Sequence, residues 1–293
     1  VGPCMFITLL FMMLLGTLIT LISSHWLLAW AGLEINMFAT IPLLAKEKHP
    51  RAMEATLKYF LMQSTAAIML LFAAASNAWL LGQWEIQHMT HPLFIMIAVL
   101  ALSLKMGLAP LHPWYPEVLQ GLNFKMGLAL STWQKLAPLA LLAQISHALP
   151  LLFSLIGLSS ILVGGWGGFN QTQLRKLLAY SSIAHLGWVI LVIHYMTPIS
   201  LMTFFIYTTL TIPIFLTFLF LKTKNMNTLF ISWSKSPLLY TLLPLSLLSL
   251  GGLPPLTGFM PKLLIIQELT KQALTPTATM AALFALLSLY FYL

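Results

Sequence analysis

Long apolar runs separated by short polar connections dominate the chain. A helix rises 1.5 Å per residue, so a run of roughly 20 apolar residues is long enough to cross a bilayer. The pattern predicts membrane-spanning helices near 3–22, 26–45, 55–81, 92–109, 126–146, 149–168, 174–195, 198–221, 238–273 and 275–293. We therefore predict an all-α, polytopic transmembrane bundle of about ten spans, forming a single domain over residues 1–293.

Two of the predicted spans contain proline-rich interruptions, with the sequences APLHPWYPEV (109–118) and GGLPPLTGFMPK (251–262). Proline lacks an amide hydrogen and clashes with the preceding turn, so a helix cannot continue normally through such stretches. Backbone groups freed inside a membrane need protein or water as partners, and breaks of this kind are common in transporters. We expect interrupted helices near Pro110–Pro113 and Pro254–Pro261.

Composition supports a membrane protein and argues against nucleic acid and iron–sulfur clusters as binding partners. The chain is 59% hydrophobic and only 7% charged, whereas soluble domains contain about 25% charged residues. Its net charge of +8 is scattered singly between apolar runs, which argues against nucleic acid as a partner. Cys4 is the only cysteine, so the chain cannot supply the four thiolates that an iron–sulfur cluster usually takes. The first 24 residues are interpreted as a retained span, not a cleaved signal.

The connections between spans differ sharply in charge. With these spans, one side of the membrane holds Lys46, Lys48, Arg51, Lys125, Arg175, Lys176, Lys222, Lys224 and Lys235, and the other chiefly Lys271. Positive charges favour the cytoplasmic or matrix side. The pattern therefore predicts that the N-terminus faces that side.

The candidate chemistry comes from ionisable groups at membrane depth: Glu34, Lys105, Lys135 and Lys262. Each such charge costs about 2.5–3.5 kcal/mol on insertion scales, so each should face the bundle interior with a partner or water. We expect all four to lie in one polar layer near mid-membrane. The alternative for any one of them is a structural ion pair or a lysine snorkelling to the interface, which is the favoured interpretation for Lys58.

His112 lies beside the first break and His185 in the middle of a span. Imidazole exchanges protons near neutral pH, so both are candidate relay groups, with helix packing as the alternative.

Other signatures are absent from the sequence. Histidine spacing gives no metal site, and the run GGWGG (164–168) completes no dinucleotide fingerprint and favours close helix packing. Aspartate does not occur, which argues against paired-carboxylate hydrolysis.

Four motifs in order carry a specific resemblance: SSHWLLAWAGLEIN (23–36), SLKMGLAPLHPWYPEV (103–118), LLAYSSIAHLGW (177–188) and LLSLGGLPPLTGFMPK (247–262). Across positions 3–293 the chain resembles the antiporter-like core membrane subunits of mitochondrial complex I, NADH:ubiquinone oxidoreductase. The resemblance implies a multi-pass protein of the mitochondrial inner membrane, in contact with lipids and with other membrane and accessory subunits. It also implies that NADH, FMN, iron–sulfur clusters and ubiquinone are handled by other chains, with no cofactor on this one.

The resemblance also assigns residues. The family's membrane glutamate corresponds to Glu34, its lysine on the first broken helix to Lys105, its central lysine to Lys135, and its lysine on the second broken helix to Lys262. His112 and His185 match positions in the family's polar axis. The family normally continues through about one more span beyond position 293, so we expect a C-terminal span to be missing here.

These assignments lead to a mechanistic hypothesis. Moving one charge through 100 mV takes about 2.3 kcal/mol, and a charge pair at about 4 Å contributes on the order of 4 kcal/mol at an effective dielectric near 20. Making or breaking a Glu34–Lys105 pair could therefore drive a proton from Lys105 to Lys135 and on to Lys262. A subunit of a stand-alone cation/proton antiporter and a non-pumping membrane scaffold are the two alternatives.

Overall fold

The computed structural model describes residues 2–46, 49–146, 149–231 and 237–292, so Lys48 and Lys235 of the charge pattern lie outside the described residues. The described ranges contain helices, turns and two isolated bridges but no β-strand. The helices are α1 (Pro3–Ile22), α2 (Trp26–Leu44), α3 (Pro50–Leu81), α4 (Pro92–Met106), α5 (Trp114–Gly121), α6 (Phe124–Ser131), α7 (Leu136–Ile145), α8 (Pro150–Gly167), α9 (Leu174–Ile193), α10 (Thr197–Leu221), α11 (Met226–Ile231), α12 (Pro237–Gly251), α13 (Phe259–Lys271) and α14 (Thr275–Tyr290), with a 3-10 turn at Trp133–Lys135.

Helix length and apolarity confirm the predicted polytopic all-α bundle. Within the described ranges, six helices are long and apolar enough to cross a membrane, namely α1, α2, α3, α8, α9 and α10. Shorter apolar helices are α4, α12 and α14. Several of these helices start with proline in their first turn, where the missing amide hydrogen would have no partner in any case.

Both predicted interruptions are present. α4 ends at Met106 and α5 begins at Trp114, while α12 ends at Gly251 and α13 begins at Phe259. A glycine with positive φ follows each broken helix, Gly107 at 75° and Gly252 at 82°. Glycine is the usual residue there because it has no Cβ to strain the left-handed conformation.

The span predicted at 126–146 is also divided, which the sequence pattern did not indicate. α6 ends at Ser131, the 3-10 turn follows, and α7 starts at Leu136. Pro138 gives a physical reason, because its ring would clash with the carbonyl of Gln134 in a continuous helix. Lys135 therefore lies in a helix break and not in the middle of a regular helix.

The chain folds into two compact units. The first unit comprises Val1–Gly107, Leu111–Leu122 and Thr132–Leu152, and the second comprises Leu108–Pro110, Asn123–Ser131 and Phe153–Leu293. A single domain over residues 1–293 stays a prediction.

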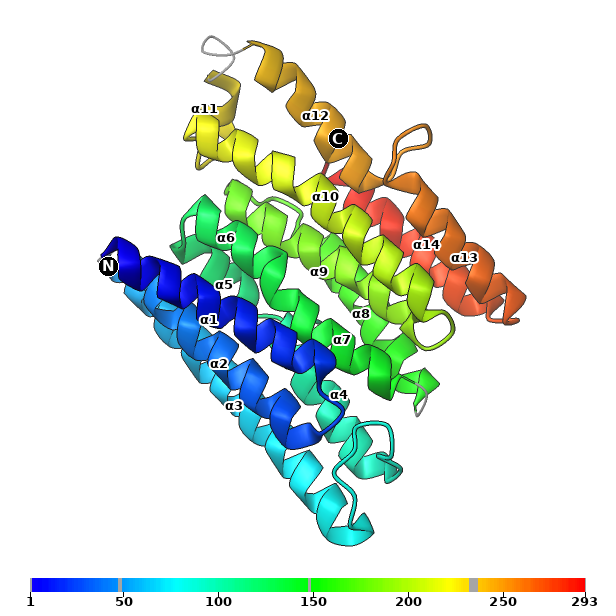
Figure 1. Ribbon diagram of the computed structural model, residues 1–293. Helices are drawn as coiled ribbons and strands as arrows, with labels where there is room; N and C mark the ends of the chain where they lie inside the picture. The colour runs from blue at the N-terminus through cyan, green and yellow to red at the C-terminus, as the bar shows by residue number, and fades with distance from the viewer. Residues whose placement is uncertain (1, 47–48, 147–148, 232–236, 293) are drawn as a thin grey trace. The chain divides into compact units, whose positions relative to one another are not determined.

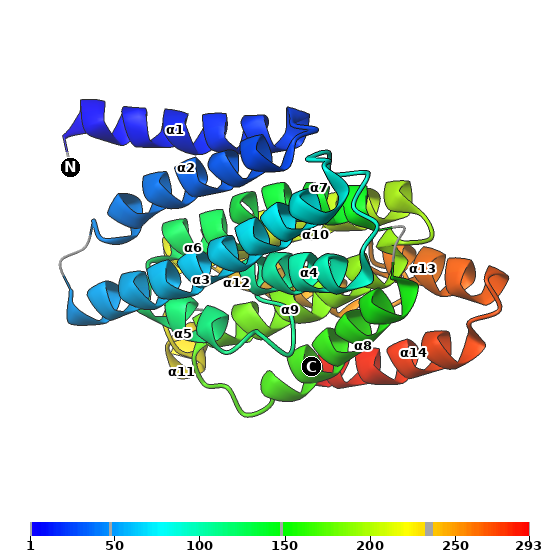
Figure 2. The same cartoon turned by 90° about the horizontal axis from the view of Figure 1, so that it is seen from below.

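In the first unit α1, α2 and α3 lie side by side (Figures 1 and 2). α1 and α2 approach closely at two glycines: a Cβ on Gly16 would lie 2.7 Å from the Gly32 oxygen. Small residues at such crossings let membrane helices pack backbone to backbone.

In the second unit α9 is the most deeply buried long helix. A core cluster joins residues of α8, α9, α13 and α14, namely Ile161, Trp188, Leu191, Val192, Ile265, Leu269, Ala278 and Ala281. Close helix packing, the favoured interpretation of the GGWGG run, is found at Gly164, where a Cβ would lie 2.6 Å from the Ala184 nitrogen.

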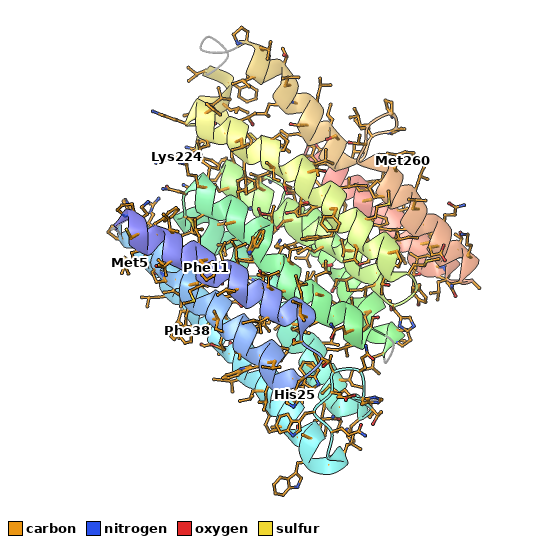
Figure 3. All side chains as sticks on the ribbon, viewed as in Figure 1. Met5, Phe11, His25, Phe38, Lys224 and Met260 are labelled. Atoms are coloured by element: carbon orange, nitrogen blue, oxygen red, sulfur yellow. The ribbon has the colours of Figure 1, made fainter. Side chains whose placement is uncertain are left out.

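Large apolar side chains cover the outer surfaces. Figure 3 labels four of them, Met5, Phe11, Phe38 and Met260, which are each more than half exposed. A folded soluble protein rarely exposes apolar area on this scale. Lipid or neighbouring membrane proteins would cover such a surface.

Three basic residues of the second unit lie close together at one end, namely Lys125, Arg175 and Lys224. The Arg175 guanidinium lies 5.7 Å from the Phe124 ring, next to Lys125, and the Leu174 amide donates to the Lys224 carbonyl at 3.2 Å. Lys271, which ends α13, lies near the other end of α9, because Leu269 packs in the cluster that holds Leu191 and Val192. This separation matches the predicted charge pattern, whereas the membrane side that each end faces stays a prediction.

Candidate functional site

The predicted site residues fall into two groups, one in each unit. Glu34, Lys105 and Lys135 belong to the first unit, on α2, α4 and the 3-10 turn. Lys105 is 6% exposed and Lys135 is 2% exposed, whereas Glu34 is only partly buried. Both lysines are therefore buried in the first unit, and the polar layer expected for these three residues stays a prediction. Whether Lys262 shares that layer stays a prediction.

Glu34 and Lys105 carry opposite charges that act on each other. In the part of the chain that the structure describes, no ion pair within 4.0 Å joins them. The structure thus places the predicted partners within electrostatic reach but not in direct contact. A movement of either side chain or a bridging water would be needed to close the pair.

The 3-10 turn is attached to α2 beside Glu34. The Gln134 side-chain amide donates to the Asn36 oxygen at 2.8 Å, two residues beyond Glu34. Lys135 follows directly, and its Nζ lies 4.4 Å from the centre of the Tyr115 ring. The division of the predicted fifth span therefore turns Lys135 toward α5.

Neutral side chains close the end of α4 at the first break. The Trp114 indole N–H donates to the Leu104 carbonyl at 3.1 Å, and the Gln63 amide donates to the Lys105 carbonyl at 3.2 Å. A helix end leaves several carbonyls without partners, and in a membrane these must be satisfied by protein or water. His112 lies within this break, where its carbonyl accepts from the Tyr115 amide at 3.0 Å.

The second group lies at the break between α12 and α13. The Lys262 ammonium donates to the Gly251 carbonyl at 2.6 Å. His185, on α9, places Nδ1 2.7 Å from the Ser181 carbonyl and Nε2 3.0 Å from the Leu250 carbonyl. A neutral imidazole has one N–H and can donate to only one of these carbonyls, whereas the protonated ring can donate to both.

Two consecutive carbonyls at the end of α12 therefore meet two titratable side chains. A helix C-terminus carries partial negative charge, which favours cations. Gly252 makes the close approach possible, since a Cβ there would lie 2.9 Å from the Lys262 Nζ. The titratable groups of Lys262 and His185 thus lie directly beside the carbonyls at the end of α12.

A small cavity adjoins this group. It has a volume of about 20 Å³, and about 10–15 Å³ is the least that holds one water, so one water fits. The lining includes His185, Thr203, Tyr207 and Lys262, with the Tyr207 ring centre 5.3 Å from that of His185. The arrangement allows a water to lie within reach of both titratable groups.

Sequence reasoning missed the groups that hold these lysines. Trp114 and Tyr115 follow the first break directly. The position of Trp114 just after the break is a signal that its indole N–H could donate to a carbonyl at the end of the broken helix. Gln63 gives no such signal, because it lies 42 positions from Lys105 in the sequence. Within the ranges described, no three His, Cys, Asp or Glu side chains are grouped as metal ligands.

Comparisons with known proteins show the family to which the chain belongs. The model of the family "NADH:quinone oxidoreductase/Mrp antiporter, TM" matches residues 23–288. NADH-ubiquinone oxidoreductase chain 2 of Tetraodon nigroviridis is 63% identical over 292 residues, which cover 100% of this chain and 84% of the relative. The same protein of Gallus gallus is 53% identical over 282 residues, covering 96% and 82%.

Solved structures give the same fold. A chain of respiratory complex I from Thermus thermophilus with bound aureothin matches with a TM-score of 0.85 and 27% identity, covering 100% of this chain and 70% of that one. A chain of the Mrp complex from Dietzia matches with a TM-score of 0.80 and 17% identity, covering 94% and 57%, which supports the fold alone.

Broken apolar helices with buried lysines define an antiporter-like membrane protein. The chain belongs to the NADH:quinone oxidoreductase/Mrp antiporter family, within which it groups with the chain 2 subunits of NADH-ubiquinone oxidoreductase. The resemblance predicted from the four motifs is confirmed.

Proposed function

We propose that the chain is the antiporter-like membrane subunit of NADH:ubiquinone oxidoreductase that carries protons through Glu34, Lys105, Lys135 and Lys262. The whole complex transfers electrons from NADH to ubiquinone, and this subunit contributes to the coupled proton translocation. One observation carries the assignment of residues: lysines are buried directly at helix breaks, where their protons can be exchanged.

Lys105 and Glu34 form the first step of the proposed relay. Their charges act on each other without direct contact, so a small approach strengthens their attraction and a small separation weakens it. Either change alters how readily Lys105 gives up its proton. Lys135 receives that proton at the divided fifth span.

Lys262 and His185 form the later step. The Lys262 ammonium donates to the Gly251 carbonyl at 2.6 Å, and His185 Nε2 lies 3.0 Å from the Leu250 carbonyl, to which it donates when it carries a proton. When His185 gains or loses a proton, the number of carbonyls it can serve changes. A proton arriving there would thus be stabilised by the helix end and released through water in the adjoining cavity. His112 is the corresponding relay candidate at the first break.

The cellular setting follows from the same family. We place the chain in the mitochondrial inner membrane as a multi-pass protein with its N-terminus on the matrix side. Its partners are the other membrane and accessory subunits of complex I and the surrounding lipids. NADH, FMN, iron–sulfur clusters and the ubiquinone site belong to other subunits, and the single cysteine of this chain fits that division of labour.

Substitution of Lys135 by methionine tests the proposal. Methionine keeps much of the apolar stem but removes the titratable group, so the buried site loses a charge without losing its packing. We expect the complex to assemble and coupled NADH:ubiquinone turnover and proton uptake to fall on the order of tenfold or more. NADH oxidation by an artificial acceptor upstream of ubiquinone should survive.

Lys224→Met is the control, because Lys224 is exposed and lies outside the relay. It should leave turnover near normal. Normal turnover with normal pumping per electron in Lys135→Met would remove Lys135 from the mechanism. Failure of that variant to assemble would support a structural role and the scaffold alternative.

A further inference from the structure

Tyr115 faces the ammonium of Lys135 inside the first unit. The Nζ lies 4.4 Å from the centre of the tyrosine ring. Both residues are buried, with Tyr115 1% exposed and Lys135 2% exposed. A cation over the face of an aromatic ring is attracted by the ring quadrupole, and the attraction is strongest where water is excluded.

The break after α4 fixes the position of this ring. Tyr115 is the second residue of α5, and its ring stands at 81° to that of Trp114, 5.6 Å between centres. Trp114 is itself tied to the Leu104 carbonyl of α4 at 3.1 Å. Gly107 lies against the tyrosine, since a Cβ there would come within 3.0 Å of the Tyr115 Cβ.

The same break therefore holds two lysines of the proposed relay. Lys105 occupies the last turn of α4, two residues before Gly107, and Tyr115 packs on that glycine while its face meets Lys135. Any movement of the α4 end that changes the surroundings of Lys105 would also move the ring on which the Lys135 ammonium lies. The geometry connects the two lysines through one rigid aromatic side chain.

We propose that Tyr115 is a positioning residue that holds the Lys135 ammonium on its ring face and transmits movement of the α4 end to it. The inference rests on the proposed function, because it matters only if Lys135 carries protons. It assigns the role to the ring and not to the phenol hydroxyl.

Three variants separate the ring from the hydroxyl and from packing. Tyr115→Phe keeps the aromatic face, whereas Tyr115→Leu removes it. Tyr59→Leu is the packing control: Tyr59 is also buried and its ring lies 6.1 Å from that of Trp114, but among the described residues no cation–ring contact is found at Tyr59. Each variant is measured in the assembled complex for coupled turnover and proton uptake across a range of pH.

We expect Tyr115→Phe to match the parent complex within about twofold, because phenylalanine offers a similar ring face. In Tyr115→Leu, the ammonium loses the ring that stabilises it, so the pH profile of coupled turnover should shift by about one unit toward lower pH. Tyr59→Leu should lower the amount of assembled complex without moving the profile. If Tyr115→Leu prevents assembly, Tyr115→Met fills the space with a flexible apolar chain and carries the same expectation.

An unmoved profile in Tyr115→Leu or Tyr115→Met would overturn the inference. An equal shift in Tyr115→Phe would also overturn it, because the hydroxyl and not the ring would then be responsible. Lys135→Met distinguishes the two levels. If Lys135→Met impairs pumping but Tyr115→Leu or Tyr115→Met leaves the pH profile of turnover unmoved, only the role of Tyr115 is rejected. Normal pumping in Lys135→Met would reject both the role of Tyr115 and the proposed role of Lys135.

Discussion

The two proline-rich helix breaks, between α4 and α5 and between α12 and α13, both follow a left-handed glycine, but different side chains bond their carbonyls. Each broken helix ends in a left-handed glycine, Gly107 after α4 and Gly252 after α12. At the first break, the neutral donors Trp114 and Gln63 take the freed carbonyls. At the second, the titratable side chains of His185 and Lys262 take them.

The side chains at the first break hold a helix end at any pH, whereas those at the second break respond to protonation. Donors that keep their hydrogens at all physiological pH values fix the end of α4 permanently, so its lysine remains available to respond to Glu34. Donors that gain and lose protons make the end of α12 depend on protonation. The first break thus resembles a fixed support for charged groups, and the second a contact whose strength changes with proton occupancy.

The largest effect is expected from Trp114→Ala at the first break. The change removes a 4% exposed indole, which costs about 3–5 kcal/mol for a large buried aromatic. It also removes the indole hydrogen bond to the Leu104 carbonyl, which keeps its bond from the Gly107 amide at 3.1 Å. We expect little assembled complex on native gels.

The controls for that change lie in the same unit and at the other break. Trp79→Ala removes an indole that is 89% exposed and should leave assembly normal. Lys262→Met should leave assembly largely intact while coupled turnover falls on the order of tenfold. Equal loss of assembly in Trp114→Ala and Lys262→Met would mean that the two breaks are held in the same way.

A smaller and more selective effect is expected when each left-handed glycine is replaced by alanine. The left-handed backbone alone costs about 1–2 kcal/mol for a residue with a Cβ. At Gly107 the added atom lies 3.0 Å from the Tyr115 Cβ, the anchored base of a buried ring. At Gly252 it meets the Lys262 Nζ at 2.9 Å, the mobile tip of a long side chain.

Gly107→Ala should therefore lower thermal stability more than Gly252→Ala, which should mainly reduce turnover by displacing Lys262 from the Gly251 carbonyl. Gly82→Ala controls for the backbone cost, because Gly82 has φ 70° and nothing within 4 Å of an added Cβ. It should lose stability and keep full turnover per assembled complex. Unchanged turnover per complex in Gly252→Ala would show that the Lys262 contact is not functional.

The breaks themselves could be predicted from sequence, because proline cannot extend a helix and both stretches carry several prolines. The candidate lysines could be predicted as well, since charge at membrane depth needs a reason. The division of the span at 126–146 was not predicted, because a single proline such as Pro138 inside an apolar run does not show where the preceding turn opens. The effect of Pro138 falls at Trp133–Lys135, three to five residues earlier.

Two of the closing side chains, His185 and Gln63, could not be predicted, because they come from distant parts of the chain. His185 meets a carbonyl 65 positions away, and Gln63 one that is 42 positions away. Helix periodicity indicates which face of a helix is apolar but not which residues of another helix oppose it. The difference between neutral and titratable closure therefore appears only in the folded chain.

The smallest effect is expected from Lys58→Met, which tests whether ion pairs help to hold the first break. Lys58 lies 2.6 Å from Glu54 and 2.7 Å from Glu117 of α5, but all three side chains are well exposed. Exposed ion pairs contribute little, since water and salt screen them. Assembly and turnover should stay within about twofold of normal in native gels and coupled assays. The tight contact of Gly121, where a Cβ would lie 2.7 Å from the Arg51 carbonyl, keeps α5 on α3 without charge. A large loss of assembled complex in both Lys58→Met and Glu117→Gln, which persists at low salt, would contradict this expectation. It would mean that charge and not neutral packing holds the first break.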